Sequence, residues 1–394
     1  MKKNIIFITV LGLLLSAAKP ANALLLNSDQ WNYALDLPED FSMTDGNGND
    51  RYQFTSSILP VDLVISTYER KKYDNAENAL DDVIKKLKGT GELTSFLWRN
   101  RECAVSSVEL NFTTEVKYIG WALSLELPYE KGWYIMLGFY PSNTDENMAM
   151  ICETEIISAL DSVCTDTGSF HECGPMTSFV YPREKPKEIQ LEIAERKIDT
   201  LIDEIDGEAN QYVIEREFTI LVCQSEYPIA QTACERFYRM VYRDAYNRLR
   251  KVSFDVQNEL TFGENGINDR FELAQTLLQW TQGFEYERDL LGSDFTSLPD
   301  LICGKGGDCD SRSMLLAVML RNMNYDTVFF VSAAYSHAMI GIALKADGAA
   351  ITAGGISYLL GETTAKVKLG QVAQEMSDSS KWVPVFFPQN LGGR

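Results

Sequence analysis

The chain has 394 residues, in which 36 Lys and Arg are outnumbered by 56 Asp and Glu, so its net charge is −20. Nucleic-acid binding needs a basic face that neutralises phosphates, and anionic lipid repels an acidic chain, so both partners are disfavoured. Hydrophobic residues make up 45% and charged residues 23%, which is typical of a globular protein. Imidazole chemistry must use His171 or His337, the only two histidines. We therefore expect no metal site and no cofactor.

The first residues have the pattern of a secretory signal peptide. Lys2 and Lys3 precede an apolar run over Ile5–Ala18, and Ala21-Asn22-Ala23 supplies a small-x-small cleavage site. The apolar run is too short to span a membrane, and no later stretch reaches 18 apolar residues. The sequence predicts that residues 1–23 are removed, that no integral membrane segment remains, and that the protein is exported to the periplasm or secreted.

The predicted export to an oxidising compartment affects what the cysteines are expected to do. Eight cysteines in an oxidising compartment favour disulfide bonds over metal binding, and the even number allows four bridges. Cys164 and Cys173 flank one polar loop, and Cys223 and Cys234 flank another. Each pair is a candidate for a local bridge.

Residues 24–180 form an N-terminal module that is rich in alternating and aromatic segments. The expected strands are Trp31–Leu37, Val61–Tyr68, Glu102–Phe112, Val116–Leu127 and Trp133–Tyr140. Helices are expected at Asn75–Leu87 and Asp145–Val163, so the module is of the α+β type with more strands than helices. Its strand order and the segment Tyr33-Ala34-Leu35-Asp36-Leu37-Pro38-Glu39 resemble an extrinsic photosystem subunit family.

Helical patterns dominate residues 181–260, which follow a loop rich in proline and glycine. One helix is expected over Glu188–Ile205, because apolar residues recur there at helical spacing. A second helical stretch is expected over Ile229–Leu260. The sequence therefore predicts a helical connector between the N-terminal module and the C-terminal domain.

Residues 261–394 combine helices and then consecutive strands, again an α+β order. A helix is expected at Arg270–Phe284, and a glycine-rich loop then leads into a helix with a wide apolar face at Arg312–Met323. Strands are expected at Thr327–Ser332, at Ala338–Leu344, through Ile351 and at Tyr358–Glu362. The wide apolar face predicts a buried central helix packed on an antiparallel sheet.

Cys309 lies where that helix begins. The N-terminus of a helix carries partial positive charge, which lowers a thiol pKa, and its free N–H groups can stabilise an oxyanion. Asp308 and Asp310 oppose thiolate formation unless they cap the helix or point away. His337 opens the strand that follows, and Glu362 ends a strand that would lie beside it. An acid there would bind the second ring N–H of the histidine and fix its tautomer.

These residues resemble the transglutaminase-like superfamily, whose members are relatives of papain-like cysteine peptidases. The resemblance covers residues 265–385, and the matching motifs are Gly307-Asp308-Cys309-Asp310, Ser336-His337-Ala338, Tyr358-Leu359-Leu360-Gly361-Glu362-Thr363-Thr364 and the lead-in Trp280-Thr281-Gln282-Gly283-Phe284-Glu285-Tyr286. It implies that Cys309 is the nucleophile, His337 the general base and acid, and Glu362 the orienting residue. The acid is more often Asp in the superfamily. Calcium sites of the animal enzymes have no counterpart here.

The expected activity is thiol-dependent acyl transfer on amide bonds of a protein or peptide substrate. Water as acceptor makes a peptidase or amidase, and a lysine amine makes a transglutaminase; the sequence leaves both open. A non-catalytic binding or scaffold protein that retains the fold is the alternative. A catalytic Cys309 leaves an odd number of cysteines, so we expect three bridges and a free Cys303 that bonds reversibly to Cys309. The sequence does not determine the oligomeric state.

Overall fold

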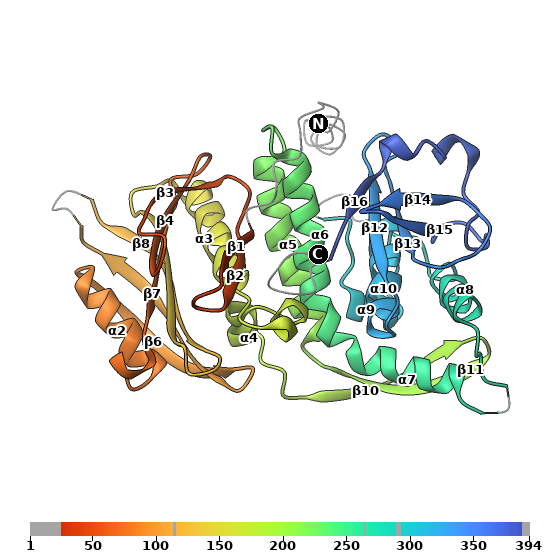
Figure 1. Ribbon diagram of the computed structural model, residues 1–394, viewed down its shortest axis with the longest axis horizontal. Coiled ribbons are helices and arrows are strands. Elements are labelled where there is room, and N and C mark those ends of the chain that lie inside the picture. The colour runs from red at the N-terminus through yellow and green to blue at the C-terminus, as the bar shows by residue number, and fades with distance from the viewer. Residues whose placement is uncertain (1–24, 113–115, 264, 289–292, 388–394) are drawn as a thin grey trace. The chain divides into compact units, whose positions relative to one another are not determined.

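The computed structural model describes residues 25–112, 116–263, 265–288 and 293–387 (Figure 1). The predicted signal peptide lies outside the described residues. Contacts divide the described chain into an N-terminal unit, residues 25–181 with 216–237, and a C-terminal unit, residues 182–215 with 238–387. The chain is of the α+β type with antiparallel sheets, as predicted. No helix of the described residues is long and apolar enough to cross a membrane.

The N-terminal unit is built on a seven-stranded antiparallel sheet in the order β3-β4-β5-β9-β8-β7-β6. Its strands are β3 (Phe41–Gly46), β4 (Arg51–Ser56), β5 (Asp62–Tyr68), β6 (Gly89–Trp98), β7 (Arg101–Leu110), β8 (Tyr118–Leu127) and β9 (Gly132–Pro141). A separate pair joins β1 (Leu25–Ser28) to β2 (Tyr33–Asp36), and its helical segments are η1 (Arg70–Lys72), α2 (Ala76–Lys86), α3 (Glu146–Asp161), η2 (Thr167–His171) and α4 (Pro175–Val180).

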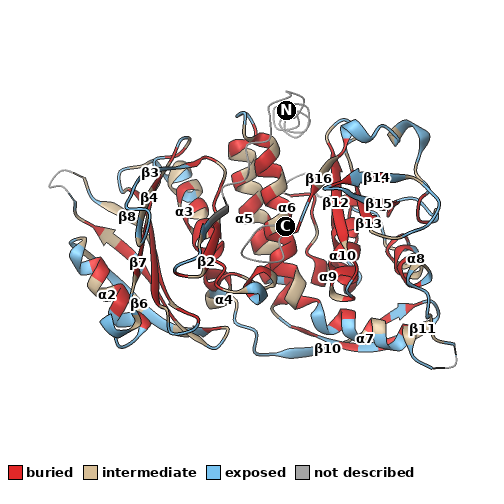
Figure 2. Cartoon of the chain, in the orientation of Figure 1, coloured by how far each residue is buried: buried red, intermediate tan, exposed pale blue. Residues whose placement is uncertain are grey.

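Helices cover both faces of this sheet. The apolar side of α2 packs on one face with Trp133 and Ile135 of β9, and α3 packs on the other with Tyr134 and Met136. Successive side chains of a strand point to opposite faces, so a strand covered on both sides must be apolar throughout. Nearly all of β9 is buried accordingly, whereas α2 exposes its outer side (Figure 2).

The five strands and two helices predicted for this module all form, with bounds that differ by a few residues. Helix α2 begins after Asn75, whose side chain accepts a hydrogen bond from Asn78, and α3 begins after Asp145, which accepts one from Met148. Such caps satisfy N–H groups that have no partner inside the helix. The prediction missed β1, β3, β4 and β6.

The helix predicted over Glu188–Ile205 is wrong, because these residues form the hairpin of β10 (Pro186–Ile193) and β11 (Arg196–Asp203). Buried residues alternate with exposed ones along both strands, which is the period of a strand and not of a helix. Leu201, one of the apolar residues whose spacing suggested that helix, is 37% exposed. Ala194 and Glu195 take positive φ angles, as a two-residue hairpin turn requires.

The helical stretch predicted over Ile229–Leu260 forms as two helices, α6 (Ala230–Arg248) and α7 (Arg250–Thr261). Helix α5 (Asp206–Gln224) precedes them. The boundary between the two units falls within α5 and again within α6, so each helix has residues in both units.

The C-terminal unit contains a five-stranded antiparallel sheet in the order β14-β15-β13-β12-β16. The strands are β12 (Thr327–Ser332), β13 (His337–Ile342), β14 (Ala350–Ala353), β15 (Ile356–Gly361) and β16 (Val383–Val385). The remaining helical segments are α8 (Arg270–Thr281), α9 (Leu298–Ile302), α10 (Cys309–Asn322), η3 (Gln374–Met376) and η4 (Ser379–Lys381).

Helix α10 lies at the centre of this unit and packs on β12 and β13 (Figures 1 and 2). All but two of its residues, Asp310 and Asn322, are buried, and the strands beneath it are buried as well. A buried helix on an antiparallel sheet is the arrangement that the sequence predicts. This packing places the first turn of α10 next to the beginning of β13.

Candidate functional site

Cys309 is the first residue of α10, and only 7% of its surface is exposed. Asp308 caps the helix, since its Oδ1 accepts hydrogen bonds from the Ser311 backbone N (2.9 Å) and Oγ (2.8 Å). The backbone N–H of a residue at this position has no partner inside the helix. The cap therefore leaves a thiol and an N–H donor at the same buried helix end.

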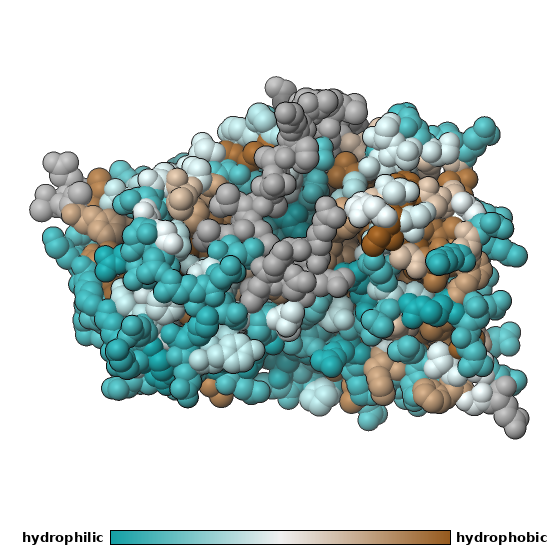
Figure 3. Space-filling model, in the orientation of Figure 1, coloured by the Kyte–Doolittle hydropathy of each residue, from teal (hydrophilic) through white to brown (hydrophobic). Residues whose placement is uncertain are grey.

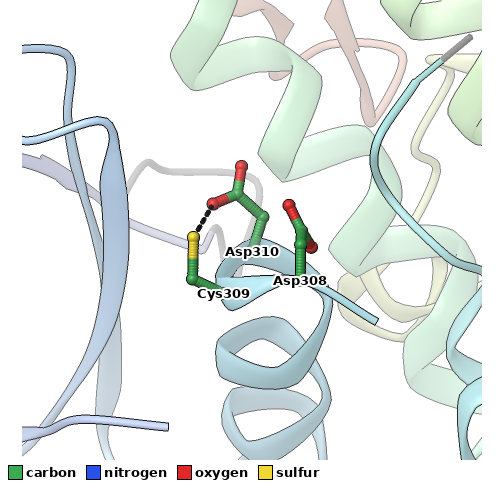
Figure 4. A group of neighbouring side chains, drawn as sticks. All are labelled: Asp308, Cys309 and Asp310. Atoms are coloured by element: carbon green, nitrogen blue, oxygen red, sulfur yellow. Dashed lines mark hydrogen bonds between the residues drawn. The ribbon is translucent and has the colours of Figure 1, made fainter. Parts of the chain in front are cut away.

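The thiol of Cys309 is held by Asp310, the next residue (Figure 4). Sγ donates a hydrogen bond to Oδ1 of Asp310 at 3.2 Å, and the hydroxyl of Tyr238 donates to Oδ2 at 2.6 Å. Of the two acids expected to oppose thiolate formation, Asp308 is used in capping, whereas Asp310 contacts the thiol directly. This contact favours the protonated form of the thiol.

Electrostatics favour the same protonation state. Burial, and then the charges of Asp310 and Asp308, raise the pKa of the Cys309 thiol far above its ordinary value, while a hydrogen bond from the Ala338 backbone lowers it. Burial and the charge of Asp310 also raise the pKa of Asp308 to about 7. The burial of Asp310 raises its own pKa, although hydrogen bonds from Tyr238 and Cys309 oppose that shift. The resting site is thus a neutral thiol between two acids with raised pKa values.

His337 is the first residue of β13 and pairs with Ser332 of β12. The preceding residue, Ser336, has φ 49°, so the chain enters the strand through a left-handed turn. The Nε2 atom of His337 lies 2.7 Å from Oε2 of Glu362, and the ring meets that of Trp382 edge-on at a centroid distance of 6.3 Å. Because Nε2 is bound to the acid, Nδ1 is the ring nitrogen left for a nucleophile.

Glu362 follows β15, the strand paired with β13, as the sequence predicts for an orienting acid. Its Oε1 accepts hydrogen bonds from the backbone N and the hydroxyl of Thr364, both at 2.7 Å. The amide of Gln282 donates to the backbone oxygens of Glu362 (2.7 Å) and Val367 (2.9 Å). Both the carboxylate and the backbone of Glu362 are therefore fixed in place.

The histidine and the acid shift each other's titration. Burial alone lowers the pKa of His337, but the hydrogen bond and charge of Glu362 outweigh it, so the pKa lies above its ordinary value. Burial alone raises the pKa of Glu362, but its bonds to His337 and Thr364 outweigh burial and lower it. Both shifts favour the charged forms, an imidazolium beside a carboxylate.

The structure brings the three predicted residues to one region but joins only two of them directly. His337 and Glu362 share a hydrogen bond, and the Cys309 sulfur receives one from the backbone of Ala338, the residue after His337. Within the described residues, no hydrogen bond joins the Cys309 sulfur to the His337 ring. The catalytic roles therefore stay predictions.

The sequence reasoning missed Arg312, which is 2% exposed in the first turn of α10. Its guanidinium donates to the backbone oxygens of Gly307 (2.9 Å) and Phe284 (2.7 Å), so it ties the loop before Cys309 to the end of α8. An arginine in the first turn of a helix with a wide apolar face was the available signal, because a buried charge must find polar partners. Tyr238, which binds Asp310, and Trp382, which contacts His337, have no sequence feature that would have marked them as site residues.

A recess of about 280 Å³ lies beside the loop that leads to Cys309. Trp280 and Phe284 line it from the end of α8, Leu301 and Ile302 from α9, and Lys305 from the loop itself. These residues all belong to the C-terminal unit. Gln190, Glu192 and Glu285 line it too, so the recess joins apolar side chains to polar and charged ones.

Asp308, Cys309 and Asp310 also place one possible metal-ligand atom each within 4.8 Å of the others. Asp308 is occupied as the helix cap, and Asp310 by Tyr238 and the thiol. An acidic cluster whose members are already engaged is weak evidence for a metal site.

The eight cysteines all lie in the described ranges, where no disulfide bond is present. The bridges predicted for Cys164 with Cys173 and for Cys223 with Cys234 are thus not formed in this structure. Cys303 is exposed and caps the end of α9, and it is not bonded to the buried Cys309. The reversible bond between Cys303 and Cys309 stays a prediction.

Comparisons with known proteins do not assign the chain to a family. No protein-family model matches it, and no curated protein matches it. Similar solved structures include cyanobacterial PsbP from Synechocystis sp. PCC 6803 (11% identity, 38% of this chain and 98% of that chain, TM-score 0.28). The Saccharomyces cerevisiae Ran-binding protein Mog1p covers 36% of this chain and 96% of its own at 8% identity and a TM-score of 0.27.

A protein from Bacteroides thetaiotaomicron covers 93% of this chain and 94% of its own, at 11% identity and a TM-score of 0.23. None of these structures is transglutaminase-like. At such scores and identities, nothing known of these proteins is carried over to this chain. Both resemblances found in the sequence stay predictions.

Proposed function

We propose that this protein is an exported, thiol-dependent acyl-transfer enzyme that cleaves or exchanges amide bonds of protein or peptide substrates. Cys309 is the nucleophile, His337 the general base and acid, and Glu362 the residue that orients the imidazole. The observation that carries the proposal is the 2.7 Å bond between His337 Nε2 and Glu362, beside a cysteine at a helix N-terminus. That arrangement fixes the histidine tautomer needed for a cysteine nucleophile.

The reaction needs the neutral form of His337, which the raised pKa of the imidazole disfavours. It begins when the thiol of Cys309 gives its proton to Nδ1 of that form. The sulfur then forms a bond to the substrate carbonyl carbon, and the N–H groups at the start of α10 stabilise the oxyanion. His337 returns the proton to the amine nitrogen as the C–N bond breaks, which leaves a thioester on Cys309. Water or an amine attacks the thioester while its proton passes through His337 to the departing sulfur.

The resting geometry must change before this reaction starts. The thiol has to leave Asp310, because a hydrogen bond to a carboxylate and two neighbouring acids disfavour the thiolate. Rotation about one side-chain bond moves the sulfur, and catalytic contacts often tighten only when substrate is bound. The recess lined by Trp280 and Phe284 offers a place for an apolar substrate side chain.

The same resting geometry favours a second candidate, a non-catalytic binding or scaffold protein. Cys309 is buried, its pKa is raised, and it bonds to Asp310 instead of to His337. A chain that had lost the activity could keep the pair of His337 and Glu362 for stability alone.

Labelling with a peptide chloromethyl ketone under mild reduction separates the two candidates. The proposal expects one label per chain, mapped to Cys309, and a large loss of labelling in His337→Ala. The matched control is Cys303→Ser, which removes the nearby exposed thiol and should leave the labelling of Cys309 unchanged. Labelling that maps to Cys303 alone, or that is equal in wild type and His337→Ala, favours the scaffold.

A further inference from the structure

A second cavity, of about 610 Å³, lies in the N-terminal unit on the sheet face that α3 covers. Two rows of cross-strand neighbours form its floor. One row runs from Thr90 of β6 through Glu109 and Ile119, and the other from Glu92 of β6 through Ser107 to Trp121. Residues that lie opposite each other on neighbouring strands point to the same face, so both rows open into one space.

The cavity is acidic. Its three carboxylates are Glu92 from β6, Glu109 from β7 and Glu153 from α3. Glu109 pairs with Lys117 at 2.7 Å, but no basic side chain of the described residues pairs with Glu92 or Glu153. The space therefore carries an excess of negative charge, and its natural complement is a cation.

The floor of the cavity is also partly apolar. The indole N–H of Trp121 donates to Glu153 at 2.7 Å, so a carboxylate is held beside an aromatic face. Aromatic faces attract ammonium and guanidinium groups, and the carbon stem of a lysine or arginine packs on apolar surface. This combination fits a basic side chain better than a bare metal ion.

Strand β6 forms one side of the cavity and one edge of the seven-stranded sheet. It is ten residues long and six of these are exposed, and among the described residues it pairs with β7 alone. In the face drawn in Figure 3, most of the surface over α2 and β6 is hydrophilic. A long exposed edge offers a row of unpaired N–H and C=O groups that another chain can use.

We propose that this edge and cavity bind an extended basic segment of another protein, which adds to β6 as an eighth strand. Main-chain hydrogen bonds to β6 supply affinity, and lysine or arginine side chains supply specificity. Side chains alternate along a strand, so every second one reaches the cavity face. A basic residue opposite Glu92 places its Cβ about 5 Å from that of the glutamate.

The probe is a fluorescein-labelled peptide of alternating lysine and valine, and its binding is followed by fluorescence anisotropy. Cys309→Ala serves as the background, so that cleavage cannot remove the probe and the result does not depend on the proposed activity. The Kd is expected to weaken about threefold in Glu92→Gln and about tenfold in Glu92→Gln with Glu109→Gln, as for exposed charge pairs. Glu130→Gln, an exposed acid in the turn after β8, is the matched control and should bind as the background does.

Two further probes test strand addition itself. A copy of the peptide with alternate backbone nitrogens methylated keeps its charge but loses edge hydrogen bonds, and we expect its Kd to be at least tenfold weaker. An alternating glutamate and valine peptide should not bind. Three results would each overturn the proposal. The methylated peptide could bind as tightly as the original, or the double variant could leave the Kd unchanged. Spermidine could also displace the labelled peptide at the same concentration as unlabelled peptide does.

Discussion

The Nε2 atom of His337 lies 2.7 Å from Oε2 of Glu362, and both side chains are about nine-tenths buried. The strands that carry them, β13 and β15, are neighbours in the sheet, and Thr364 holds the other oxygen of the acid. This pair favours the charged imidazole and directs its Nε2 atom to the acid. The first turn of α10 presents Cys309 to the same end of β13.

Glu362→Gln should lower stability most in a limited pH range. The lowered pKa of Glu362 stabilises the fold above the ordinary glutamate value of about 4.3, and that contribution is lost as pH falls. The raised pKa of His337 stabilises it below the ordinary histidine value of about 6.5, and that contribution is lost as pH rises. Urea denaturation between these values should show a loss of about 3 kcal/mol, as for other buried pairs.

The matched control for that measurement is Glu375→Gln, an exposed glutamate of η3 in the same unit. It should leave the unfolding free energy unchanged at every pH. An equal loss in Glu362→Gln at pH 5.5 and pH 10 would show that the ion pair does not form.

Asp310→Asn should make Cys309 more reactive at neutral pH. The Asp310 carboxylate accepts the thiol hydrogen bond, and its negative charge raises the thiol pKa. An uncharged amide removes that repulsion, so the pH midpoint of alkylation should fall. At a pH below the midpoint, each unit by which the thiol pKa falls raises the thiolate fraction about tenfold. We expect roughly three- to tenfold faster alkylation of Cys309 at pH 8, measured by peptide mapping.

Asp347→Asn changes an exposed acid of the same unit and should leave the alkylation midpoint of Cys309 where it is. The claim that Asp310 raises the thiol pKa would be contradicted if the midpoint stayed fixed or rose in Asp310→Asn while the circular dichroism was unchanged.

Gln282→Leu should destabilise the C-terminal unit. The Gln282 amide donates to the backbone oxygens of the buried Glu362 and the half-buried Val367, and leucine leaves both acceptors without that donor. Such a loss costs about 2 kcal/mol, which thermal unfolding detects as a lower Tm. Gln374→Leu, at an exposed position of η3, is the control. Equal Tm values in the two variants would exclude this function of Gln282.

Arg216→Met should strongly destabilise the N-terminal unit. Arg216 is buried and binds Asp161 at 2.5 Å and Glu217 at 2.9 Å. Its removal leaves the buried Asp161 without its cation, whereas Glu217 keeps Arg236 at 2.6 Å, and we expect a cost of about 3 kcal/mol. Lys85→Met breaks only an exposed pair with Asp81 and should cost less than about 0.5 kcal/mol in urea denaturation. Similar losses in both variants would contradict this difference.

The sequence predicted best the elements that bury a continuous apolar face. Helix α10 and strands β9, β12 and β13 were expected close to their observed bounds, because few polar residues interrupt them. The approach of His337 to Glu362 also followed from the sequence, because both were placed at the ends of neighbouring strands. That inference needed only strand order and not side-chain detail.

The errors have two physical causes. The hairpin of β10 and β11 has apolar residues whose spacing also fits a helix, and the turn at Ala194 and Glu195 contains no glycine or asparagine to mark it. Strand β6 was missed because an edge strand with six exposed residues lacks an apolar pattern. The bond between Cys309 and Asp310 depends on a side-chain rotamer, which the sequence does not encode locally.

The most direct test of the proposed activity is the rate at which iodoacetamide alkylates Cys309 at pH 7, resolved by peptide mapping in wild type and His337→Ala. In the proposed mechanism, the imidazolium formed when His337 takes the thiol proton stabilises the thiolate, so we predict at least a tenfold slower reaction of Cys309 in His337→Ala. The exposed Cys303 in the same digest is the internal control and should react equally in both proteins. Equal rates at Cys309 would contradict the claim that His337 activates this thiol.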